Sequence, residues 1–421
     1  MKNIIVLGAG FAGLRTAIKL GKKLNNLGDY RVILIDKETY HTYTPSLYEV
    51  ASAYRGSKIE KHETHKIESE LAGSVCFSIS DILGKQKISF IKGEVVDINT
   101  DTRSVILKSD EAIQYEYCVL ALGSQVAHYN VEGSEAYCAS LKTVHDALEI
   151  RTAIQALIRR AGTQNKDELR IATIGAGLTG FELTTEIVKW ISHLRSSVPG
   201  IKKTKIEILM VDAEDKILTE VPDKMRRLAE KRLDNLGIKV VTKAKIIRVE
   251  PHQITMENGR TVRTDFVLWG GGVKGLELFS NIRGLSLAKS RRVEATAFLQ
   301  AKGQTRVFVA GDSAHIVDKE RDIPVPATAW AAEQEADAVA DNIFRSIKGQ
   351  PLKEYVTKYP GFVSSAGGKY GVAHLYGVAF AGFFAWAVKR VIDLKYILSL
   401  YTPVKGLGIW LKELKLFTRN D

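Results

Sequence analysis

The chain has 421 residues, of which 45% are hydrophobic and 26% charged, a globular balance that excludes a wholly disordered chain. At about 100–200 residues per domain, we expect two or three domains. The 60 Lys and Arg residues against 48 Asp and Glu give a net charge of +12, which favours an anionic partner but does not distinguish nucleic acid, lipid headgroups and an anionic cofactor.

The three cysteines, Cys76, Cys118 and Cys138, lie far apart in the sequence. This spacing excludes a disulfide-rich secreted scaffold and a cysteine-based zinc module. The first predicted strand begins almost at Met1 and leaves no room for a signal peptide, so we expect a reducing, cytoplasmic setting. His62-Glu63-Thr64-His65 lacks the HExxH spacing, and we expect no metal site.

The chain opens with an apolar run, residues 2–7, then Gly8-Ala9-Gly10-Phe11-Ala12-Gly13 and a helical pattern to about residue 26. In a GxGxxG loop between strand and helix, the first glycine permits the tight turn and the second admits a pyrophosphate. The third lets helix and strand pack closely. A second apolar run, 31–35, ends in Asp36, 23 positions after Gly13 (36 − 13), where an acid can bind a ribose diol.

The same unit recurs 167 positions later (175 − 8). An apolar run at 169–174 leads into a second glycine loop and a helical pattern to about residue 194, and the run 205–211 ends in Asp212. We predict an α/β fold with two Rossmann-like domains, each with a dinucleotide site. The glycines of these sites are Gly8, Gly10 and Gly13 in the first and Gly175, Gly177 and Gly180 in the second. A pair of purely structural turns is the alternative.

The residues after Asp212 bear on the choice of dinucleotide. Asp212 is followed by Ala213, Glu214 and Asp215, with no arginine beside it. A 2′-phosphate there would meet like charge without a guanidinium partner, so NADH is favoured over NADPH. Glu182 follows the second glycine loop, where the helix dipole by itself favours a carboxylate.

Shorter β-like runs lie at 89–96, 104–107, 117–120, 239–250 and 266–268, and a late strand at 306–310 precedes Gly311-Asp312-Ser313-Ala314 and a helix over 328–347. The two fingerprints, their order and this late motif resemble the two-dinucleotide flavoprotein reductases. The resemblance implies FAD at the first fingerprint and NADH at the second. It also places Asp312 at a helix N-terminus, on the ribityl and phosphate portion of the flavin. Residues 117–123 resemble the element that closes the FAD site, with Leu122 in place of the usual threonine.

The cysteines narrow the choice among the classes of these flavoprotein reductases. Disulfide reductases need a paired redox cysteine, the peroxidase-type relatives one near His41, and sulfide-oxidising relatives a pair, and the chain has none of these. We expect Cys118 in a buried strand and Cys138 on an ordinary surface stretch. The chain is most similar to type II NADH dehydrogenase, the single-subunit, non-pumping NADH:quinone oxidoreductase of respiratory electron transport, over nearly its whole length.

This resemblance implies site residues. Residues 40–51 are similar to the family loop that passes near the isoalloxazine, and 269–273 to its contact with the nicotinamide nucleotide. Glu182 matches the family glutamate proposed to couple protons or charge beside the flavin, and with Gln334 it forms the implied catalytic pair. Further implied cofactor-binding residues are Phe11, Ala12, Lys37, Thr44, Val96, Gly123, Gly271, Ala329 and Lys369.

One departure concerns the electron acceptor. The family's quinone helix carries A-Q-x-A-x-Q, and residues 329–334 here keep Gln334 but have Trp330 in place of the first glutamine. An indole offers a flat stacking face but no amide oxygen. Trp330 is either part of an altered acceptor site or a core or interface aromatic. The acceptor is a membrane quinone or, alternatively, a soluble electron-transfer protein.

The tail has a different composition. Residues 371–388 just reach the length of a membrane span, but three glycines argue against one. Leu407, Trp410, Leu411, Leu414 and Phe417 recur at helical spacing, with Lys405, Lys412, Lys415 and Arg419 on other faces. Such a helix fits insertion in the plane of an anionic bilayer surface. Packing on the protein body or at a homodimer interface is the alternative.

We therefore predict an FAD-binding domain from 1–140 and 279–349, an NADH-binding domain at 141–278 and a membrane-associating region at 350–421. The predicted protein is a peripheral enzyme on the cytoplasmic face of the membrane that carries electrons from NADH through FAD to quinone without pumping protons. A flavin-bearing interaction module resembling apoptosis-inducing factor, with a basic surface for nucleic acid, is the alternative from another class. We expect no nucleic-acid binding, because the basic tail is interleaved with Leu, Trp and Phe.

Overall fold

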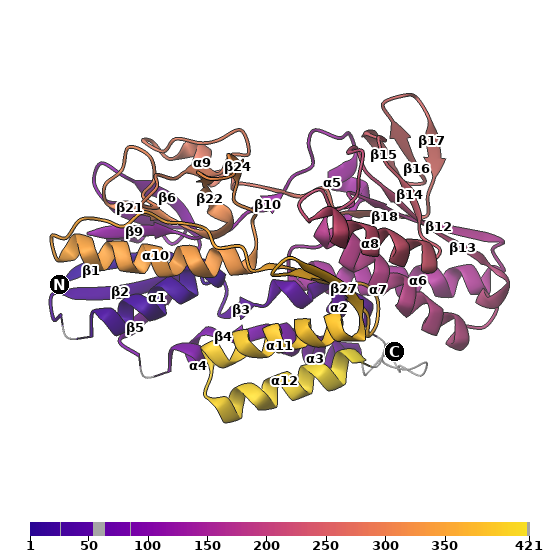
Figure 1. Cartoon of the computed structure of the whole chain (residues 1–421), viewed down its shortest axis with the longest axis horizontal. Helices are drawn as coiled ribbons and strands as arrows, with labels where there is room; N and C mark the ends of the chain where they lie inside the picture. The colour runs from indigo at the N-terminus through magenta and orange to yellow at the C-terminus, as the bar shows by residue number, and fades with distance from the viewer. Residues whose placement is uncertain (26, 54–63, 85, 419–421) are drawn as a thin grey trace. The chain divides into compact units, whose positions relative to one another are not determined.

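The computed structural model describes residues 1–25, 27–53, 64–84 and 86–418 (Figure 1). The chain divides into two compact units, and each contains one glycine loop. Unit 1 comprises Met1–Thr42, Phe77–Gln125 and Val273–Tyr359, and unit 2 comprises Tyr43–Cys76, Val126–Gly272 and Pro360–Asp421. These units are defined by packing alone. The predicted ranges for FAD and NADH binding concern ligands and stay predictions.

Unit 1 is built on a parallel five-stranded sheet of order β21-β9-β1-β2-β5. The strands are β1 (Lys2–Leu7), β2 (Tyr30–Asp36), β5 (Ile88–Lys92), β9 (Tyr117–Leu120) and β21 (Val307–Val309). All four residues of β9 are buried, and so are the last four of β1, as expected where a parallel sheet is covered on both faces. Helix α1 (Phe11–Lys23) packs along α10 (Ala329–Ile347), where Arg15 donates two hydrogen bonds of 2.7 Å to the Asp337 carboxylate.

Unit 1 also contains a small sheet and several short elements, two of which share one residue with unit 2. An antiparallel sheet consists of β6 (Val95–Asn99), β7 (Ser104–Leu107) and β8 (Ala112–Gln114). The short elements are β3 (Tyr40–Thr42), β4 (Cys76–Ser78), α4 (Ile79–Leu83), β10 (Gln125–Val126), β19 (Val273–Lys274), α9 (Leu278–Asn281), β20 (Val293–Glu294), η4 (Gly311–Ser313), β22 (Ala314–His315), β23 (Val317–Asp318) and β24 (Ile323–Pro324).

Unit 2 repeats the architecture with a parallel sheet of order β11-β18-β12-β13-β14. Its strands are β11 (Ala139–Ser140), β12 (Glu168–Ile174), β13 (Lys205–Val211), β14 (Lys239–Val241) and β18 (Phe266–Trp269). An antiparallel sheet follows, with β15 (Ile246–Glu250), β16 (Gln253–Met256) and β17 (Thr261–Arg263). The prediction of an α/β fold with two parallel-sheet units is confirmed.

Unit 2 also contains helices, most of which contribute to one apolar core. They are α2 (Leu47–Ser52), α3 (Thr64–Val75), α5 (Ser134–Tyr137), α6 (Val144–Thr163), α7 (Leu178–Ser197) and α8 (Asp223–Asn235), with the turns η1 (Thr44–Ser46) and η3 (Ile201–Lys203). Phe181 and Trp190 of α7 are fully buried in this core. Leu416 and Phe417, near the end of the chain, belong to the same core. Burial of two large side chains of this kind anchors the last helix to unit 2.

The tail of unit 2 begins with an antiparallel sheet of β25 (Gly361–Ser365), β26 (Gly371–Leu375) and β27 (Val378–Gly382). Two helices follow, α11 (Phe383–Leu400) and α12 (Pro403–Phe417). The apolar stretch 371–388 therefore forms two strands and the start of a helix, as its glycines indicated. No helix in the described part of the chain is both long and apolar enough to cross a bilayer.

Two of the predicted β-like runs are each two strands. Residues 89–96 divide between β5 and β6, where the chain turns at Gly93. Residues 239–250 divide between β14 and β15, where Lys243 has a left-handed φ of 53°. A residue in that conformation cannot continue an extended strand.

Candidate functional site

The two glycine loops have the same local geometry. The N–H of Gly8 donates to the carbonyl of Ile35 at 2.8 Å, and the N–H of Gly175 donates to that of Val211 at 2.8 Å. Gly8 has φ +95° and Gly175 φ +101°. A Cβ on Gly8 would lie 2.3 Å from a backbone oxygen, and one on Gly175 would lie 2.4 Å from another. Glycine is therefore required at the first position of both loops.

The second and third glycines differ in what surrounds them. A Cβ on Gly13 would lie 1.8 Å from the Gly8 oxygen and one on Gly180 2.1 Å from the Gly175 oxygen, so the third glycine permits close packing of helix on loop. A Cβ on Gly10 would have no described atom within 4 Å. This open space faces the start of α1, where N–H groups and the helix dipole favour a phosphate, and the residues present fit a dinucleotide.

The two acids are held in matching ways. Asp36 Oδ2 accepts from the N–H of Ala9 at 2.6 Å and its Oδ1 from Glu38 at 2.8 Å. In unit 2, Asp212 Oδ2 accepts from the N–H of Ala176, and its Oδ1 accepts from Glu214 at 2.8 Å. Burial raises the pKa of Asp36, while the two N–H groups act in the opposite direction. Each oxygen keeps a lone pair for a ribose hydroxyl.

The late motif packs on the loop after β9. Ser124 Oγ donates to Asp312 Oδ2 at 2.7 Å, and the Gly123 N–H donates to Ser313 Oγ at 2.9 Å. Asp312 lies in the single 3-10 turn η4, whereas α10 begins only at Ala329. The resemblance implied a helix N-terminus for Asp312, but the structure places it in a short turn beside the loop after β9.

Glu335 was missed in the sequence. Its side chain is only 3% exposed, and its Oε2 accepts from the Gly311 N–H at 2.6 Å. Burial and the neighbouring Asp312 charge raise its pKa to about 8, so the carboxyl is mainly protonated at neutral pH. The missed signal is an acid at the spacing of the buried residues Ala332, Ala336 and Val339 of α10.

His41 also supports the first glycine loop. The imidazole is 1% exposed, and its Nδ1 lies 2.8 Å from the carbonyl oxygen of Ala9. The Phe11 ring packs edge-on against it, with centroids 5.0 Å apart. Burial lowers the pKa of His41 to about 4, which keeps the ring neutral. A neutral ring with Nδ1 protonated donates to Ala9 and fixes the loop.

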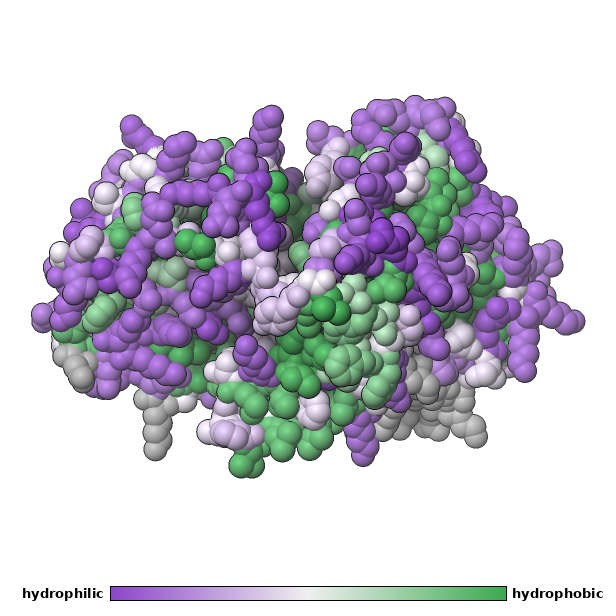
Figure 2. All heavy atoms as spheres, viewed as in Figure 1, coloured by the Kyte–Doolittle hydropathy of each residue, from purple (hydrophilic) through white to green (hydrophobic). Residues whose placement is uncertain are grey.

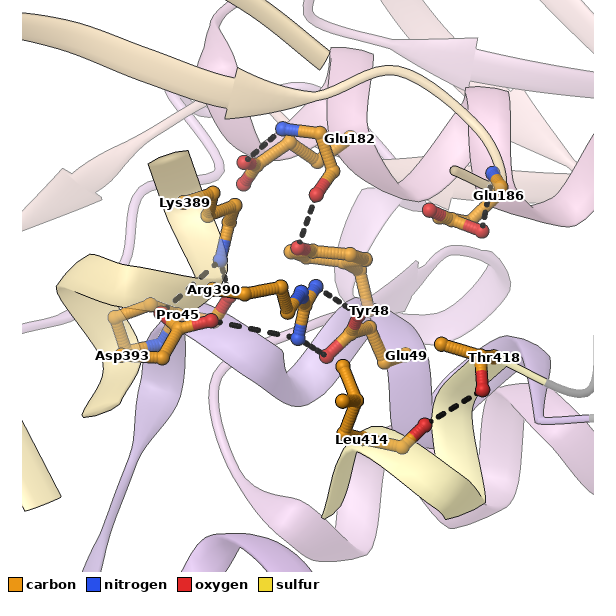
Figure 3. Close-up of polar contacts among 12 residues, drawn as sticks. Pro45, Tyr48, Glu49, Glu182, Glu186, Lys389, Arg390, Asp393, Leu414 and Thr418 are labelled. Atoms are coloured by element: carbon orange, nitrogen blue, oxygen red, sulfur yellow. Dashed lines mark hydrogen bonds and ion pairs between the residues drawn. The ribbon is translucent and has the colours of Figure 1, made fainter. Parts of the chain in front are cut away.

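In unit 2, Glu182 lies near the start of α7 and faces β25 (Figure 3). Its Oε1 accepts from Ser364 Oγ at 3.1 Å and from the Ser365 N–H at 3.2 Å, and Tyr48 donates to Ser365 Oγ at 2.7 Å. Burial raises the pKa of Glu182 to about 7, against the opposing effect of the Lys389 charge and the two hydrogen bonds. Such a carboxyl can exchange a proton near neutral pH.

A buried charge cluster adjoins Tyr48 in the same view. Arg390 pairs with both oxygens of Glu49 and, at 3.3 Å, with Asp393, and Tyr43 donates to Asp393 at 2.6 Å. Lys389 lies 3.6 Å from Asp393. Both cations are only 5% exposed. Ionised groups this deep need such partners.

The predicted acceptor helix is α10. Trp330 is half-buried and lies edge-on to Tyr359, with ring centroids 5.5 Å apart, and Arg321 lies 3.6 Å from the centre of the Tyr359 ring. Gln334 exchanges two hydrogen bonds of 3.1 Å with the backbone of Lys358. The amide therefore holds the segment before β25 against α10, a role that the family signature did not indicate.

The other predicted residues are divided between the units. Phe11, Ala12, Lys37, Val96 and Ala329 lie in unit 1, and Thr44, Lys369 and Gly271 lie in unit 2. Lys37 and Lys369 are exposed, and Val96 is 43% exposed. Ala12 is buried against the late motif, because a Cβ on Gly311 would lie 3.1 Å from its methyl group.

The cysteines and the possible metal ligands were also considered in the sequence. None of the three cysteines forms a disulfide; Cys118 is buried in β9, as expected, and burial raises its pKa. Cys138 is half-buried against the core of unit 2 instead of lying on an ordinary surface stretch. No group of three or more His, Cys, Asp or Glu side chains among the described residues is arranged for a metal ion. His62, Glu63 and Arg419 lie outside those residues.

Residues 2–336 match the family of pyridine nucleotide-disulphide oxidoreductases. The chain belongs to this family. Type II NADH:quinone oxidoreductases are similar to this family member over 98% of both chains: the protein of Staphylococcus saprophyticus is 27% identical over 419 residues, and that of Staphylococcus aureus strain NCTC 8325 is 28% identical over 425 residues.

Solved structures support the same fold. NDH2 from Plasmodium falciparum in complex with NADH has a TM-score of 0.81, 19% identity and 98% coverage of both chains. The sulfide:quinone oxidoreductase of Aquifex aeolicus has a TM-score of 0.75 and 22% identity, and covers 94% of this chain and 91% of its own. This pyridine nucleotide-disulphide oxidoreductase has no closely spaced cysteine pair, in contrast to the chemistry in the family's name.

Proposed function

We propose that this protein is a type II NADH:quinone oxidoreductase, which takes electrons from NADH through FAD to a membrane quinone without pumping protons. The relatives with that name are similar to it over 98% of both chains, which supports the proposal. In this proposal, residues 1–140 and 279–349 hold FAD, and residues 141–278 hold NADH.

The observation that carries this proposal is the duplicated glycine loop with its oriented acid. Both copies have a glycine that no other residue can replace and a carboxylate fixed by two backbone N–H groups. Two such sites in one chain need two dinucleotides. Without a closely spaced cysteine pair, electrons have no thiol route out of the flavin, which favours an external acceptor such as a quinone.

Bound FAD supplies two-electron chemistry between a hydride donor and a quinone. The chain positions the cofactors: Asp36 and Asp212 bind ribose hydroxyls, and Asp312, oriented by Ser124, binds the ribityl and phosphate portion of the flavin. Glu182 holds or releases a proton at its carboxyl oxygens, since its pKa of about 7 leaves both forms populated at neutral pH.

The acceptor is proposed to bind beside Ala329–Gln334. The half-buried indole of Trp330 supplies a flat face suited to a quinone ring. The engagement of Gln334 with Lys358 and the loss of the first family glutamine favour an acceptor site based on stacking. The same two observations support the alternative, a reductase for a soluble electron-transfer protein.

Membrane attachment is proposed to use the exposed apolar side chains of α11 and α12, which Figure 2 shows as a green area. Val404 is 87% exposed, Phe384 68%, Phe383 63%, Leu411 51% and Leu407 45%. A contiguous apolar surface of this kind marks a lipid or protein interface. On the cytoplasmic face it would give a peripheral enzyme, and a homodimer would cover the same side chains.

The enzyme test is stopped-flow kinetics of the flavin-loaded protein. NADH should bleach the flavin band, and menaquinone or ubiquinone analogues should restore it faster than soluble electron-transfer proteins do. A protein that purifies colourless and cannot be reconstituted with FAD would overturn the proposal. Rapid reoxidation of the flavin by soluble electron-transfer proteins but not by quinones would support the alternative, a reductase for such a protein.

The attachment test is flotation with vesicles in the absence of detergent. Leu407→Glu/Leu411→Glu should lose flotation, whereas Glu230→Gln, an exposed change on α8, should not. If the wild type stays soluble but changes from dimer to monomer when the double substitution is introduced, the surface is a homodimer interface.

A further inference from the structure

The loop between β13 and α8 brings a carboxylate to the second glycine loop. Glu220 Oε1 accepts a hydrogen bond of 3.2 Å from the N–H of Leu178, the first residue of α7. The same oxygen would lie 3.6 Å from a Cβ on Gly177, and apart from the residues adjoining Gly177 in the chain no other described atom lies within 4 Å of that position. Glu220 thus lies where a dinucleotide phosphate binds in a GxGxxG loop.

The first glycine loop has no such neighbour. A Cβ on Gly10, the equivalent of Gly177, has no atom within 4 Å among the described residues. The two loops otherwise match in their first-glycine φ angles and in the hydrogen bonds to their acids. Among the described residues, a carboxylate at this position therefore occurs only at the second glycine loop, the proposed NADH site.

The backbone that carries Glu220 is held firmly. Leu218 has a left-handed φ of 49°, and its N–H donates to the carbonyl of Ala176 at 2.9 Å. The guanidinium of Arg226, only 8% exposed, donates to the carbonyls of Ile217 and Val221 at 2.9 and 3.0 Å. These contacts fix the loop against the glycine loop, while the Glu220 side chain itself is exposed.

The charge of Glu220 works in two directions. Without a dinucleotide, the carboxylate satisfies an N–H group that the helix leaves unpaired and complements the positive end of the α7 dipole. With a dinucleotide, the same position is needed by a pyrophosphate with two negative charges. The carboxylate must then leave, and from a nearby rotamer it still repels the phosphates.

We propose that Glu220 is a displaceable anion that competes with the NADH pyrophosphate for the start of α7 and so sets the affinity of unit 2 for the dinucleotide. This inference rests on the proposed function, because it assumes that NADH is the ligand of the second glycine loop. In this role Glu220 affects how tightly NADH binds and how fast it exchanges, and it takes no part in the chemical step.

The test is calorimetric titration of the FAD-loaded protein with ADP-ribose, which carries the pyrophosphate but no nicotinamide. Glu220→Gln keeps the size of the side chain and removes its charge, and should bind ADP-ribose about three- to tenfold more tightly than the wild type at low salt. The difference should shrink between about 0.02 M and about 0.5 M salt, because ions screen an exposed charge. Glu220→Ala, which also clears the site, should bind at least as tightly.

Two controls test whether the effect depends on a charge at position 220 and on the phosphates of the ligand. Glu230→Gln makes the same change in net charge on an exposed face of α8 and should leave the affinity for ADP-ribose unchanged. Adenosine, which has no phosphate, should bind all variants equally. In steady-state kinetics the Glu220→Gln variant should lower KM for NADH, with kcat changed little.

Equal or weaker binding of ADP-ribose to Glu220→Gln would overturn this inference. Weaker binding to both Glu220 variants would mean that the carboxylate accepts hydrogen bonds from the ligand. Stopped-flow reduction by NADH distinguishes this failure from that of the proposed function: a flavin that NADH still reduces leaves the enzyme assignment intact, and a flavin that NADH cannot reduce removes both.

Discussion

Replacing Glu413 by glutamine removes an acid that α12 buries beside other carboxylates. Glu413 is 3% exposed, and its Oε1 has no hydrogen-bond partner in the described structure. Burial and the charges of Asp393 and Glu49 raise its pKa to about 9, and the charges of Arg390 and Lys389 offset only part of this rise. The native protein therefore keeps Glu413 protonated at neutral pH.

The sign of the effect follows from proton binding. The unfolded chain releases the Glu413 proton near the ordinary pKa of 4.5, whereas the folded chain holds it to about pH 9. Between these values the native state binds one more proton, so the free energy of unfolding falls by about 1.4 kcal/mol per pH unit. At pH 7 the loss amounts to about 3 kcal/mol and at pH 8 to about 5 kcal/mol, as upper bounds.

Glu413→Gln should therefore be more stable than the wild type at neutral pH, by up to about 3 kcal/mol at pH 7, with no gain near pH 4.5. Urea unfolding at a series of pH values measures the difference. Trp410 of α12 donates to the Arg390 carbonyl of α11 at 2.9 Å, so α12 is held against α11. Hydrogen exchange of peptides from α12 therefore tests whether the gain in stability is local to this helix. Glu230→Gln on the exposed face of α8 is the control. A Glu413→Gln advantage that stays constant between pH 5 and 8, or a loss of stability at pH 7, would refute the assignment of a buried neutral acid.

Three further outcomes are expected. Glu182→Gln should slow turnover at least tenfold and abolish the pH dependence near 7, while the visible flavin spectrum stays; an unchanged pH–rate profile would remove its role. Gly10→Ala should weaken FAD binding more than tenfold with an unchanged circular dichroism spectrum, because its methyl group enters the space that a phosphate needs. Gly13→Ala, in contrast, should impair folding, because a Cβ there meets the Gly8 backbone. Equal FAD affinity of wild type and Gly10→Ala would show that no phosphate approaches Gly10. The His41 imidazole should not titrate between pH 5.5 and 8 in NMR spectra, since its pKa is about 4, and a titration near 6.5 would contradict its burial.

The sequence predicted the parts of the site that depend on local backbone geometry. A glycine loop, the strand before it and the acid at the end of the next strand lie close together in the sequence, at 2–36 and 169–212, and their spacing fixes a turn that few other sequences can form. The bounds of β1, β2, β12 and β13 accordingly lie within one residue of the predicted runs.

The groups that the sequence did not reveal depend on contacts between distant segments. Glu335 is 24 positions from the Gly311 N–H that it accepts from, and Glu49 is 341 positions from Arg390. Periodicity shows which face of a helix is buried, but not that a carboxylate on this face will meet a backbone N–H or a guanidinium. Glu220 is a similar case, because only the folded loop shows that it reaches the start of α7.

Helix α11 shows how this limitation changes the account of the tail. Lys389, Arg390 and Asp393 face inward, whereas Phe383, Phe384 and Val391 are more than 60% exposed, so the helix has its charges inside and much of its apolar surface outside. Lys389 and Arg390 neutralise Glu49 and Asp393 and are not available to lipid headgroups. The proposed attachment therefore depends on exposed apolar area and on the exposed lysines at 395, 405, 412 and 415. With each such lysine worth about 1 kcal/mol at an anionic surface, the net charge of the tail alone is a poor measure of its affinity for membranes.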